Sequence, residues 1–513
     1  MTRSPVWSEA AAKLRASEPF RRLVETGGDV TGLPLAAASW VLGTAGESLP
    51  APLLVVVPHE PAAQAWLEAA RLFGTSAEFF PVGGLSPYQA AEVSLSVRAQ
   101  QVVALDAWLD GRVDGLVCTP PGLFQRLPGR RGFRELIVEI RAGDEVAVDD
   151  LARRLTAAGY QRSDLVSEVG DFAVRGGVFD VFSPGAERPV RLDLFGDTVE
   201  SLREFEVEDQ RSTGSVEAVR LLPLDLYSVS PEAARRLAAH LEARLAKIGS
   251  EGTADLEALC SKGGYPGWTA LLPVLEPEPE SLPTLRAGTR LVVVDPEAAA
   301  AAVEAHWSLH QRDHASSRRE RRLTAPPEDI EWTGEEVSGQ LATPWVRVLG
   351  LATTPSAIDF NAAATDDFVR QLPRFPRELE TAADRGERVV LVAPEEHRAR
   401  LESYLRDQPQ GATALIETGE LQRGFRLPAA AVAIYSERQL FRDLGPPARR
   451  RRSHLGPFVS GLRDLRIGDH VVHAEHGIGR FVALRHVGTG ADEAAPLPSS
   501  LASLREERTR LKN

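Results

Sequence analysis

The hydrophobic pattern of the chain changes at about residue 131, and this change most constrains how the chain can fold. Before it, short apolar runs alternate with longer amphipathic stretches: "LLVVV" (53–57), a helix from Glu60 to about Phe73, "AEFFPV" (77–82), a helix from about Tyr88 to Asp110, and "GLVCTPP" (115–121). Strands joined by helices of this length form a parallel sheet with helices on its faces. We therefore predict an α/β domain over residues 1–130.

The remaining residues predict several further domains, because a chain of 513 residues exceeds what one hydrophobic core supports. The fold class is α/β and α+β multidomain. In order, we expect an α+β domain at 131–217, a helix-rich segment at 218–340, a second α/β domain at 345–445, a linker at 446–464 and a compact β segment at 465–513.

Residues 174–196, "VRGGVFDVFSPGAERPVRLDLFG", predict two strands around a turn at 183–185. Alternation along "VRLDLF" places Arg191 and Phe195 on one face, away from the apolar face, and Arg175 opens the partner strand. Arginines donate paired hydrogen bonds to carboxylates, and an exposed aromatic ring anchors small interfaces. Two interpretations stay open: a contact surface, or a Phe195 covered by its own domain beside solvated arginines.

The scarcity of lysine argues against a nucleotide-hydrolysing enzyme. A phosphate-binding loop needs a glycine-rich turn followed by lysine, and none of the four lysines follows a glycine. Where such a loop is expected, before the 53–57 strand, the sequence is "VTGLPLAAASWVLG" (30–43). Other catalytic motifs are absent, and Cys118 and Cys260 cannot form a metal site by themselves. We predict no catalytic residues, no metal and no cofactor.

Charge and hydropathy set the expected surroundings. The net charge of −13 opposes a dedicated nucleic-acid surface, and the run Arg449 to Arg452 is interpreted as part of a solvated tether rather than a phosphate site. Asp295, which precedes a proline, is interpreted as a helix start rather than a Mg²⁺ ligand. With neither a run of about 18 apolar residues nor a signal peptide, we expect a cytoplasmic protein without membrane contact.

Four motifs resemble the N-terminal half of the bacterial transcription-repair coupling factors, the Mfd family, which shares a module with the excision-repair protein UvrB. They are "GDFAVRGGVFDVFSPGAERPVRLDLFGDTVESLREFEVEDQRS" (170–212), "GGYPGWTALLP" (263–273), "TGELQRGFRLPAAAVAIYSERQLF" (418–441) and "GDHVVHAEHGIGR" (468–480). They occur in the family's order and cover the chain up to about Val487.

The resemblance implies that residues 1–340 form a UvrB-like module with a degenerate phosphate loop. It implies that the 131–217 domain docks onto UvrA, and Arg175, Arg191 and Phe195 occupy the positions of the family's contact residues. The segment from Leu465 resembles the RNA polymerase interaction domain, a β-barrel that docks on the polymerase β subunit, with its partner edge near Val487. The barrel strands that should follow are replaced by "GTGADEAAPLPSS", so we expect an incomplete barrel and no translocation motor in this chain.

The function that follows is a non-catalytic adaptor, which recruits UvrA to stalled RNA polymerase in nucleotide excision repair. It would contact DNA only indirectly, and its polymerase binding would be weakened or lost. Two alternatives stay open. One is a UvrB-like ATPase with an unrecognised nucleotide site, and the other is a non-functional remnant of a coupling factor with a frameshift near Val487.

An incomplete barrel would leave unpaired strand edges, so limited proteolysis should cut mainly within residues 445–513 and leave a stable fragment that still binds UvrA. Mass spectrometry of the fragments would locate the cuts. A protease-resistant C-terminal segment that binds polymerase tightly would contradict this expectation.

Overall fold

The computed structural model describes residues 4–441, except 50, 85, 90–91, 249–252, 321, 351–354 and 409–410, together with strands at 470–473 and 477–480. The chain divides into two units, Met1–Phe458 and Val459–Asn513. Among the helices that the structure describes, none is long and apolar enough to cross a lipid bilayer.

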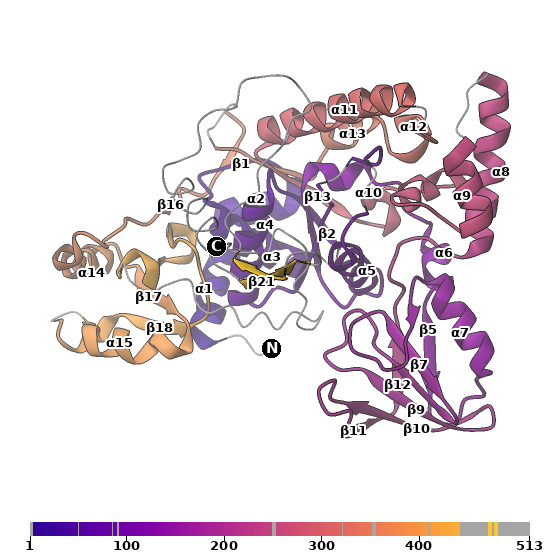
Figure 1. Cartoon of the computed structure of the whole chain (residues 1–513). Coiled ribbons are helices and arrows are strands. Elements are labelled where there is room, and N and C mark those ends of the chain that lie inside the picture. Colours follow the sequence, from indigo (N-terminus) through magenta and orange to yellow (C-terminus); the bar gives the residue numbers. More distant parts are fainter. Residues whose placement is uncertain are drawn as a thin grey trace, which may run out of the picture. The chain divides into compact units, whose positions relative to one another are not determined.

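The largest sheet has seven parallel strands in the order β15-β1-β14-β13-β2-β4-β3 (Figure 1). Side chains alternate across it, so Val55 faces one core, whereas Leu54 and Val56 face another. Helices α1 to α4 contribute to the first core and α5, α11 and α13 to the second. The elements are β1 (Gly28–Thr31), β2 (Leu53–Val56), β3 (Ala77–Phe80), β4 (Gly115–Cys118), β13 (Arg290–Val294), β14 (Val346–Val348), β15 (Ile358–Asp359), α1 (Pro5–Ala16), α2 (Glu18–Thr26), α3 (Leu35–Ser48), α4 (Glu60–Leu72), α5 (Leu95–Leu109), α11 (Pro296–Arg319) and α13 (Gly334–Ala342).

Two features of this sheet differ from the sequence prediction. Strands β13, β14 and β15 lie in the segments predicted at 218–340 and 345–445, yet they pair within the sheet of the 1–130 segment. Local periodicity cannot reveal such pairing, because it depends on where the chain returns. Helix α5 begins after Ser94, whose hydroxyl accepts from the Val97 amide, rather than near Tyr88, which is buried in another core.

The predicted α+β domain contains a six-stranded sheet in the order β11-β10-β9-β8-β7-β6, and its core includes α7 (Figure 1). A two-stranded ribbon of β5 and β12 stands at its two chain ends, with Val138 paired to Leu221. The bounds are β5 (Val138–Arg141), α7 (Val148–Ala157), β6 (Gln161–Arg162), β7 (Asp171–Arg175), β8 (Val178–Val181), β9 (Val190–Phe195), β10 (Thr198–Phe205), β11 (Ser212–Val216) and β12 (Ala218–Leu221).

The segment at 218–340 is mainly helical, as predicted, and it has a core of its own around Trp268 and Leu237. Asp295 caps α11: its carboxylate accepts from the Ala298 amide, which agrees with the helix-start interpretation. The remaining helices of this segment are α8 (Pro231–Ile248), α9 (Thr253–Lys262), α10 (Leu282–Leu285), α12 (Pro327–Ile330) and the 3₁₀ helix η2 (Trp268–Leu275). The 3₁₀ helix η1 (Pro120–Phe124) and helix α6 (Arg130–Glu135) come earlier in the chain, between β4 and β5.

The second α/β region has a five-stranded sheet in the order β16-β19-β20-β17-β18. One of its faces merges with the first core of the large sheet, where Trp40 stacks on Phe73 at 4.6 Å and both rings approach Phe425. This region is therefore not the independent domain that its sequence pattern indicates. The bounds are β16 (Ala363–Ala364), α14 (Phe375–Asp384), β17 (Arg388–Ala393), α15 (Glu395–Arg406), β18 (Leu415–Thr418), β19 (Phe425–Leu427), β20 (Val432–Ser436), η3 (Leu372–Arg374), η4 (Gly411–Thr413), η5 (Pro428–Ala430) and η6 (Glu437–Gln439).

In the second unit, the structure describes an antiparallel hairpin of β21 (His470–His473) and β22 (Gly477–Arg480). This hairpin lies within the compact β segment that the sequence predicts over residues 465–513. Val487 and the remainder of the predicted barrel lie outside the described residues.

Because Phe425 is fully buried in the core shared by both sheets, Phe425→Ala should lower the free energy of unfolding by about 3–5 kcal/mol. Urea unfolding followed by tryptophan fluorescence checks this, since Trp7 and Trp40 lie in the same aromatic cluster. Phe195→Ala, at an exposed position, is the control and should stay within about 0.5 kcal/mol. A cost below 1 kcal/mol at Phe425 would contradict the shared core.

Candidate functional site

A buried carboxylate organises one face of the six-stranded sheet. Asp180 on β8 is fully buried and lies directly across from Arg191 on β9. The guanidinium of Arg191 binds both carboxylate oxygens, with Nε–Oδ1 at 2.7 Å and Nη2–Oδ2 at 2.9 Å. Arg175, the last residue of β7, donates to Oδ2 at 2.6 Å. Two arginines from neighbouring strands therefore converge on a single carboxylate, which they neutralise and hold in place.

The surroundings of Arg191 fix its orientation. Its guanidinium lies 4.6 Å from the ring of Phe205 and also donates to the Gln210 carbonyl. Hydrogen bonds to Asp180 raise the pKa of Arg191 further above its usual value. The side chain of Arg191 is 17% exposed, whereas that of Arg175 is 46% exposed. These contacts therefore fix the orientation of the Arg191 side chain, whereas donor atoms of Arg175 remain exposed to solvent.

The turn between β7 and β8 requires glycine. Gly176 has φ of +59°, and a Cβ on Gly177 would approach the Leu194 carbonyl at 2.6 Å. These glycines let β7 and β8 pair tightly, which brings Arg175 to the carboxylate of Asp180.

Phe195 ends β9 and is 77% exposed, next to the turn at Gly196 and Asp197 that leads into β10. The other large apolar side chains that stand exposed in the described structure, Leu165 and Leu309, are 44% and 42% exposed. Exposure of a whole aromatic ring removes the stabilisation that burial would give, about 1.5–3 kcal/mol for a side chain of this size. The ring is therefore available to a partner rather than to its own core.

The structure brings together part of the predicted set. Arg175 and Arg191 meet at Asp180, but Arg175 ends β7 instead of opening the partner strand. Phe195 lies four residues beyond Arg191 on the same strand, or roughly 13 Å along it. The interpretation that Phe195 is covered by its own domain is wrong, and the arginines are ion-paired rather than merely solvated. Their partner role stays a prediction.

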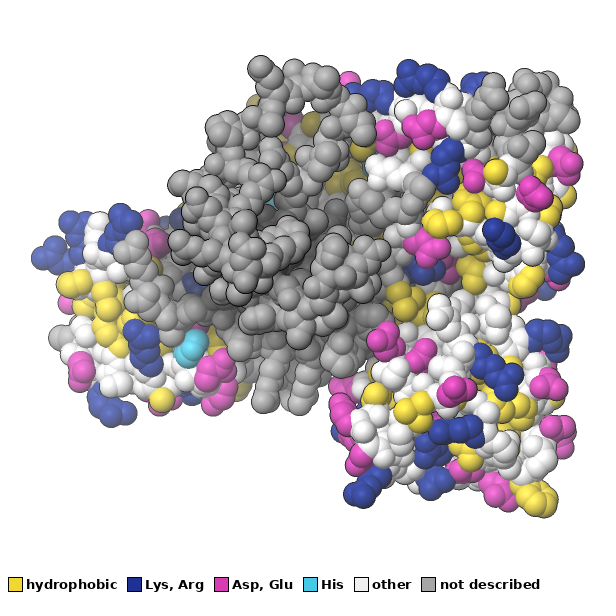
Figure 2. Space-filling view, in the orientation of Figure 1, with side chains coloured by type: hydrophobic (Ala, Val, Ile, Leu, Met, Phe, Trp, Pro, Cys, Tyr) yellow, Lys and Arg dark blue, Asp and Glu magenta, His cyan; other side chains and the backbone are white. Residues whose placement is uncertain are grey.

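Sequence reasoning missed Asp180 as the centre of the site. The signal was present, because Asp180 is the charged residue that interrupts the apolar run 178–182. A second pairing on the neighbouring strands was also missed: Arg203 binds Asp193 at 2.6 Å, and Ser201 donates to the same carboxylate. Figure 2 shows basic and acidic side chains mixed on the visible side of this domain. Such a mixed surface suits a protein partner better than a phosphate backbone.

The loop between β1 and α3 occupies the place where a phosphate-binding loop would lie. Gly32 has φ of +62°, and a side chain there would collide with the carboxylate of Asp359. Helix α3 starts after Pro34, which offers no side-chain cap. An acidic group therefore adjoins this loop, and it would repel a nucleotide phosphate.

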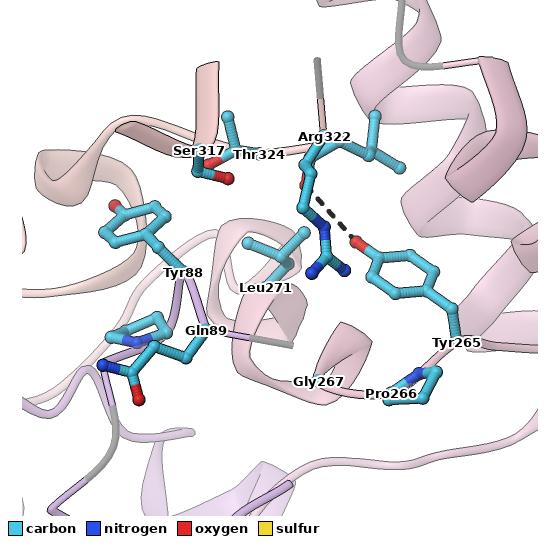
Figure 3. A pocket seen from close by; sticks show the side chains of 11 residues that line it. Tyr88, Gln89, Tyr265, Pro266, Gly267, Leu271, Ser317, Arg322 and Thr324 are labelled. Carbon is cyan, nitrogen blue, oxygen red and sulfur yellow. Dashed lines mark hydrogen bonds between the residues drawn. The ribbon is translucent and has the colours of Figure 1, made fainter. Parts of the chain in front are cut away.

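Figure 3 shows a small pocket lined by Tyr88, Tyr265, Arg322 and neighbouring residues. Its phenols are committed: Tyr265 donates to the Leu323 carbonyl, and Tyr88 donates to the Ala325 carbonyl. Burial raises the pKa of both hydroxyls. Arg322 is paired with Asp255 and lies over the Tyr265 ring. These contacts hold residues 322–325 in position, so the polar groups that line the pocket serve the fold.

Comparison with known proteins identifies two segments. Residues 138–227 match the UvrB interaction domain, and residues 465–496 match the CarD-like/TRCF RID domain. The first match contains the Asp180 face and Phe195, and the second contains the β21–β22 hairpin.

Curated relatives are similar over most of this chain. The protein named transcription-repair-coupling factor of Myxococcus xanthus is 29% identical over 92% of this chain and 44% of its own length. Those of Mycobacterium tuberculosis and Bacillus subtilis are 27% and 24% identical, over 92% and 79% of this chain. The chain spans about two fifths of the length of these relatives. Together with the two domain matches, they confirm the resemblance seen in the sequence: the chain is similar to an N-terminal portion of the transcription-repair coupling factors.

Proposed function

We propose that the chain serves as an adaptor in transcription-coupled repair, and that the 138–227 domain binds UvrA through the face around Asp180 and Phe195. The observation that carries the proposal is the 77% exposure of Phe195 beside an arginine pair, inside a segment that matches the UvrB interaction domain. An aromatic anchor beside charged hydrogen-bond donors is the usual composition of an interface hot spot.

The geometry suggests different roles for the three residues. Phe195 would insert into an apolar pocket of the partner, and Arg175, which is partly exposed, would donate to a partner carboxylate. Arg191 already uses its donors on Asp180 and Gln210, so it would act mainly by holding the Asp180 carboxylate that orients Arg175. Arg191 is thus a positioning residue for the contact.

The second half of the proposal is that residues 465–496 face RNA polymerase, as the match to the CarD-like/TRCF RID domain suggests. The assignment to the β subunit, with an edge near Val487, is part of this proposal. One chain that carried both segments could hold UvrA and polymerase together, which raises the effective concentration of each for the other.

We also propose that this adaptor function requires no nucleotide bound to the described part of the chain. The loop at Gly32 adjoins the carboxylate of Asp359, which would oppose the approach of a nucleotide phosphate. The competing ATPase interpretation gains no support from these groups.

Phe195→Ala should weaken binding of the full chain to purified UvrA by about 2 kcal/mol or more, since the ring would be a buried anchor in the complex. Arg175→Ala should cost about 1.5–3 kcal/mol through the loss of a charged hydrogen bond. Titration calorimetry measures both. The fold should survive, because Arg191 alone still binds both oxygens of Asp180.

Leu165→Ala is the matched control for this experiment. Leu165 is an exposed apolar residue of the same domain, in the loop between β6 and β7, and its removal should change UvrA binding by less than about 0.5 kcal/mol. Unchanged affinity in both Phe195→Ala and Arg175→Ala would rule out this face as the contact. Equal losses in all three variants would point to a general defect of the domain instead.

Mg-ATP should leave the melting temperature of the full chain unchanged, because the carboxylate of Asp359 adjoins the loop between β1 and α3, which lies where a phosphate loop would. A ligand present at 100 times its dissociation constant would add about 2.7 kcal/mol of stability, so binding would be visible by calorimetry. A clear upward shift would disprove the nucleotide-free proposal and revive the ATPase.

A further inference from the structure

Helix α11 carries histidines at three positions spaced by four residues, in "HWSLHQRDH" (306–314). Residues four apart share a face of a helix, so His306, His310 and His314 line one side of α11. This side contacts η1 and α12. The spacing was visible in the sequence, but only the structure shows what faces it.

Glu331, which directly follows α12, faces the first two histidines. Its Oε2 lies 2.7 Å from Nδ1 of His310 and 3.5 Å from Nε2 of His306. The two imidazole rings have centroids 4.0 Å apart. All three side chains are nearly buried, with exposed fractions of 12%, 5% and 6% for His306, His310 and Glu331. Two imidazoles and one carboxylate therefore converge away from solvent.

These groups are the donor set and the size of a Zn²⁺ site. One donor atom from each of the three residues lies within 4.8 Å of the other two. Zn²⁺ binds nitrogen and oxygen at about 2.0–2.2 Å, so donors of a tetrahedral shell stand roughly 3.3–3.5 Å apart. The observed separations of 2.7 and 3.5 Å are close to that range, and small side-chain rotations would accommodate the ion.

His306 gives an independent indication of a ligand. Its Nε2 is buried and, apart from its 3.5 Å approach to Oε2 of Glu331, has no hydrogen-bond partner within the described part of the chain. A poorly satisfied buried polar atom is costly, and a metal ion bound through this nitrogen would remove that cost.

The backbone around these donors is held in place before any ion binds. The Trp332 amide donates to the Phe124 carbonyl, and Arg126 donates to the Glu331 carbonyl, which ties the 331–332 segment to η1 and the loop after it. The ring of Phe124 lies 4.3 Å from that of His306 and excludes water from one side. Rigid placement of ligands lowers the entropy cost of binding an ion.

We propose that His306, His310 and Glu331 form a Zn²⁺ site that joins α11 to the segment after α12, with a water molecule as the fourth ligand. Nitrogen and carboxylate donors without a thiolate suit zinc, and an ion held by these donors would link two segments that lie apart in the sequence. The alternative occupant is a proton: burial opposes the ionisation of Glu331, yet the two histidines keep its pKa below its usual value.

The test uses the purified full chain, stripped with EDTA and then titrated with ZnCl₂ against a chromophoric chelator. We expect one Zn²⁺ per chain and a higher melting temperature in its presence. His306→Ala and Glu331→Gln should each weaken zinc binding by at least about tenfold. Glu331→Gln keeps the volume of the side chain and one acceptor oxygen but removes the negative charge, so it tests the ligand role even if His306→Ala folds poorly.

His397→Ala is the matched control. His397 forms a similar pair with Glu437, at 2.9 Å from both carboxylate oxygens, but the described residues show no second histidine beside it. This variant loses a histidine–carboxylate pair and should still bind one Zn²⁺ with unchanged affinity. A wild-type chain that takes up no zinc, or zinc binding that persists unchanged in Glu331→Gln, would overturn the proposal and leave a protonated ion-pair cluster.

Discussion

The parallel pairing of β1 with β14 and β15 determines the architecture of residues 4–441. Gly28 pairs with Val346 and Val30 with Ile358, so β1 can pair with both of its neighbours in the sheet only after most of the chain has been added. Contacts this distant in sequence are costly to close and are formed cooperatively. The segment between β4 and β13 is an insertion, and both of its ends lead into the seven-stranded sheet. The UvrB interaction domain is part of that insertion.

Ion pairs attach this insertion to helix α5. Arg220 on β12 binds Asp106 of α5 at 2.6 Å and Asp110, the residue just after α5, at 2.8 Å, and also pairs with Glu139 on β5. Asp106 is almost fully buried there. A buried ion pair contributes less net stability than its contacts suggest, because both charges lose water, but breaking it is costly. The ion pair between Arg220 and Asp106 favours one position of the β5–β12 ribbon on α5. This ribbon joins the domain that carries Phe195 to α5.

The sequence predicted the features that depend on local residue patterns, such as strand faces and turns. Alternation in 190–195 correctly placed Arg191 opposite the apolar face, and turn signals at 183–185 correctly separated β8 from β9. It could not predict that β13 and β14 join the first sheet, since parallel partners are chosen by the return of distant segments. It also could not predict the convergence of two arginines on Asp180, or of Glu331 on the α11 histidines. Those arrangements require cross-strand register and helix packing, neither of which a local window contains.

The scarcity of lysine acquires a structural meaning at these junctions. Only four of the 59 basic residues are lysines, and the buried carboxylates of Asp180 and Asp106 are each matched by arginine. A guanidinium binds both oxygens of a carboxylate with fixed planar geometry, whereas an ammonium acts as a strongly hydrated point charge. At Asp180 the bidentate bond from Arg191 satisfies one edge of the carboxylate and leaves Oδ2 able to accept from Arg175 as well. Lysine at position 191 would keep the charge but lose the second bond, and the orientation of Arg175 would then depend on a mobile carboxylate. At both buried acids, arginine therefore binds the two carboxylate oxygens at once, which a lysine could not do with the same fixed geometry.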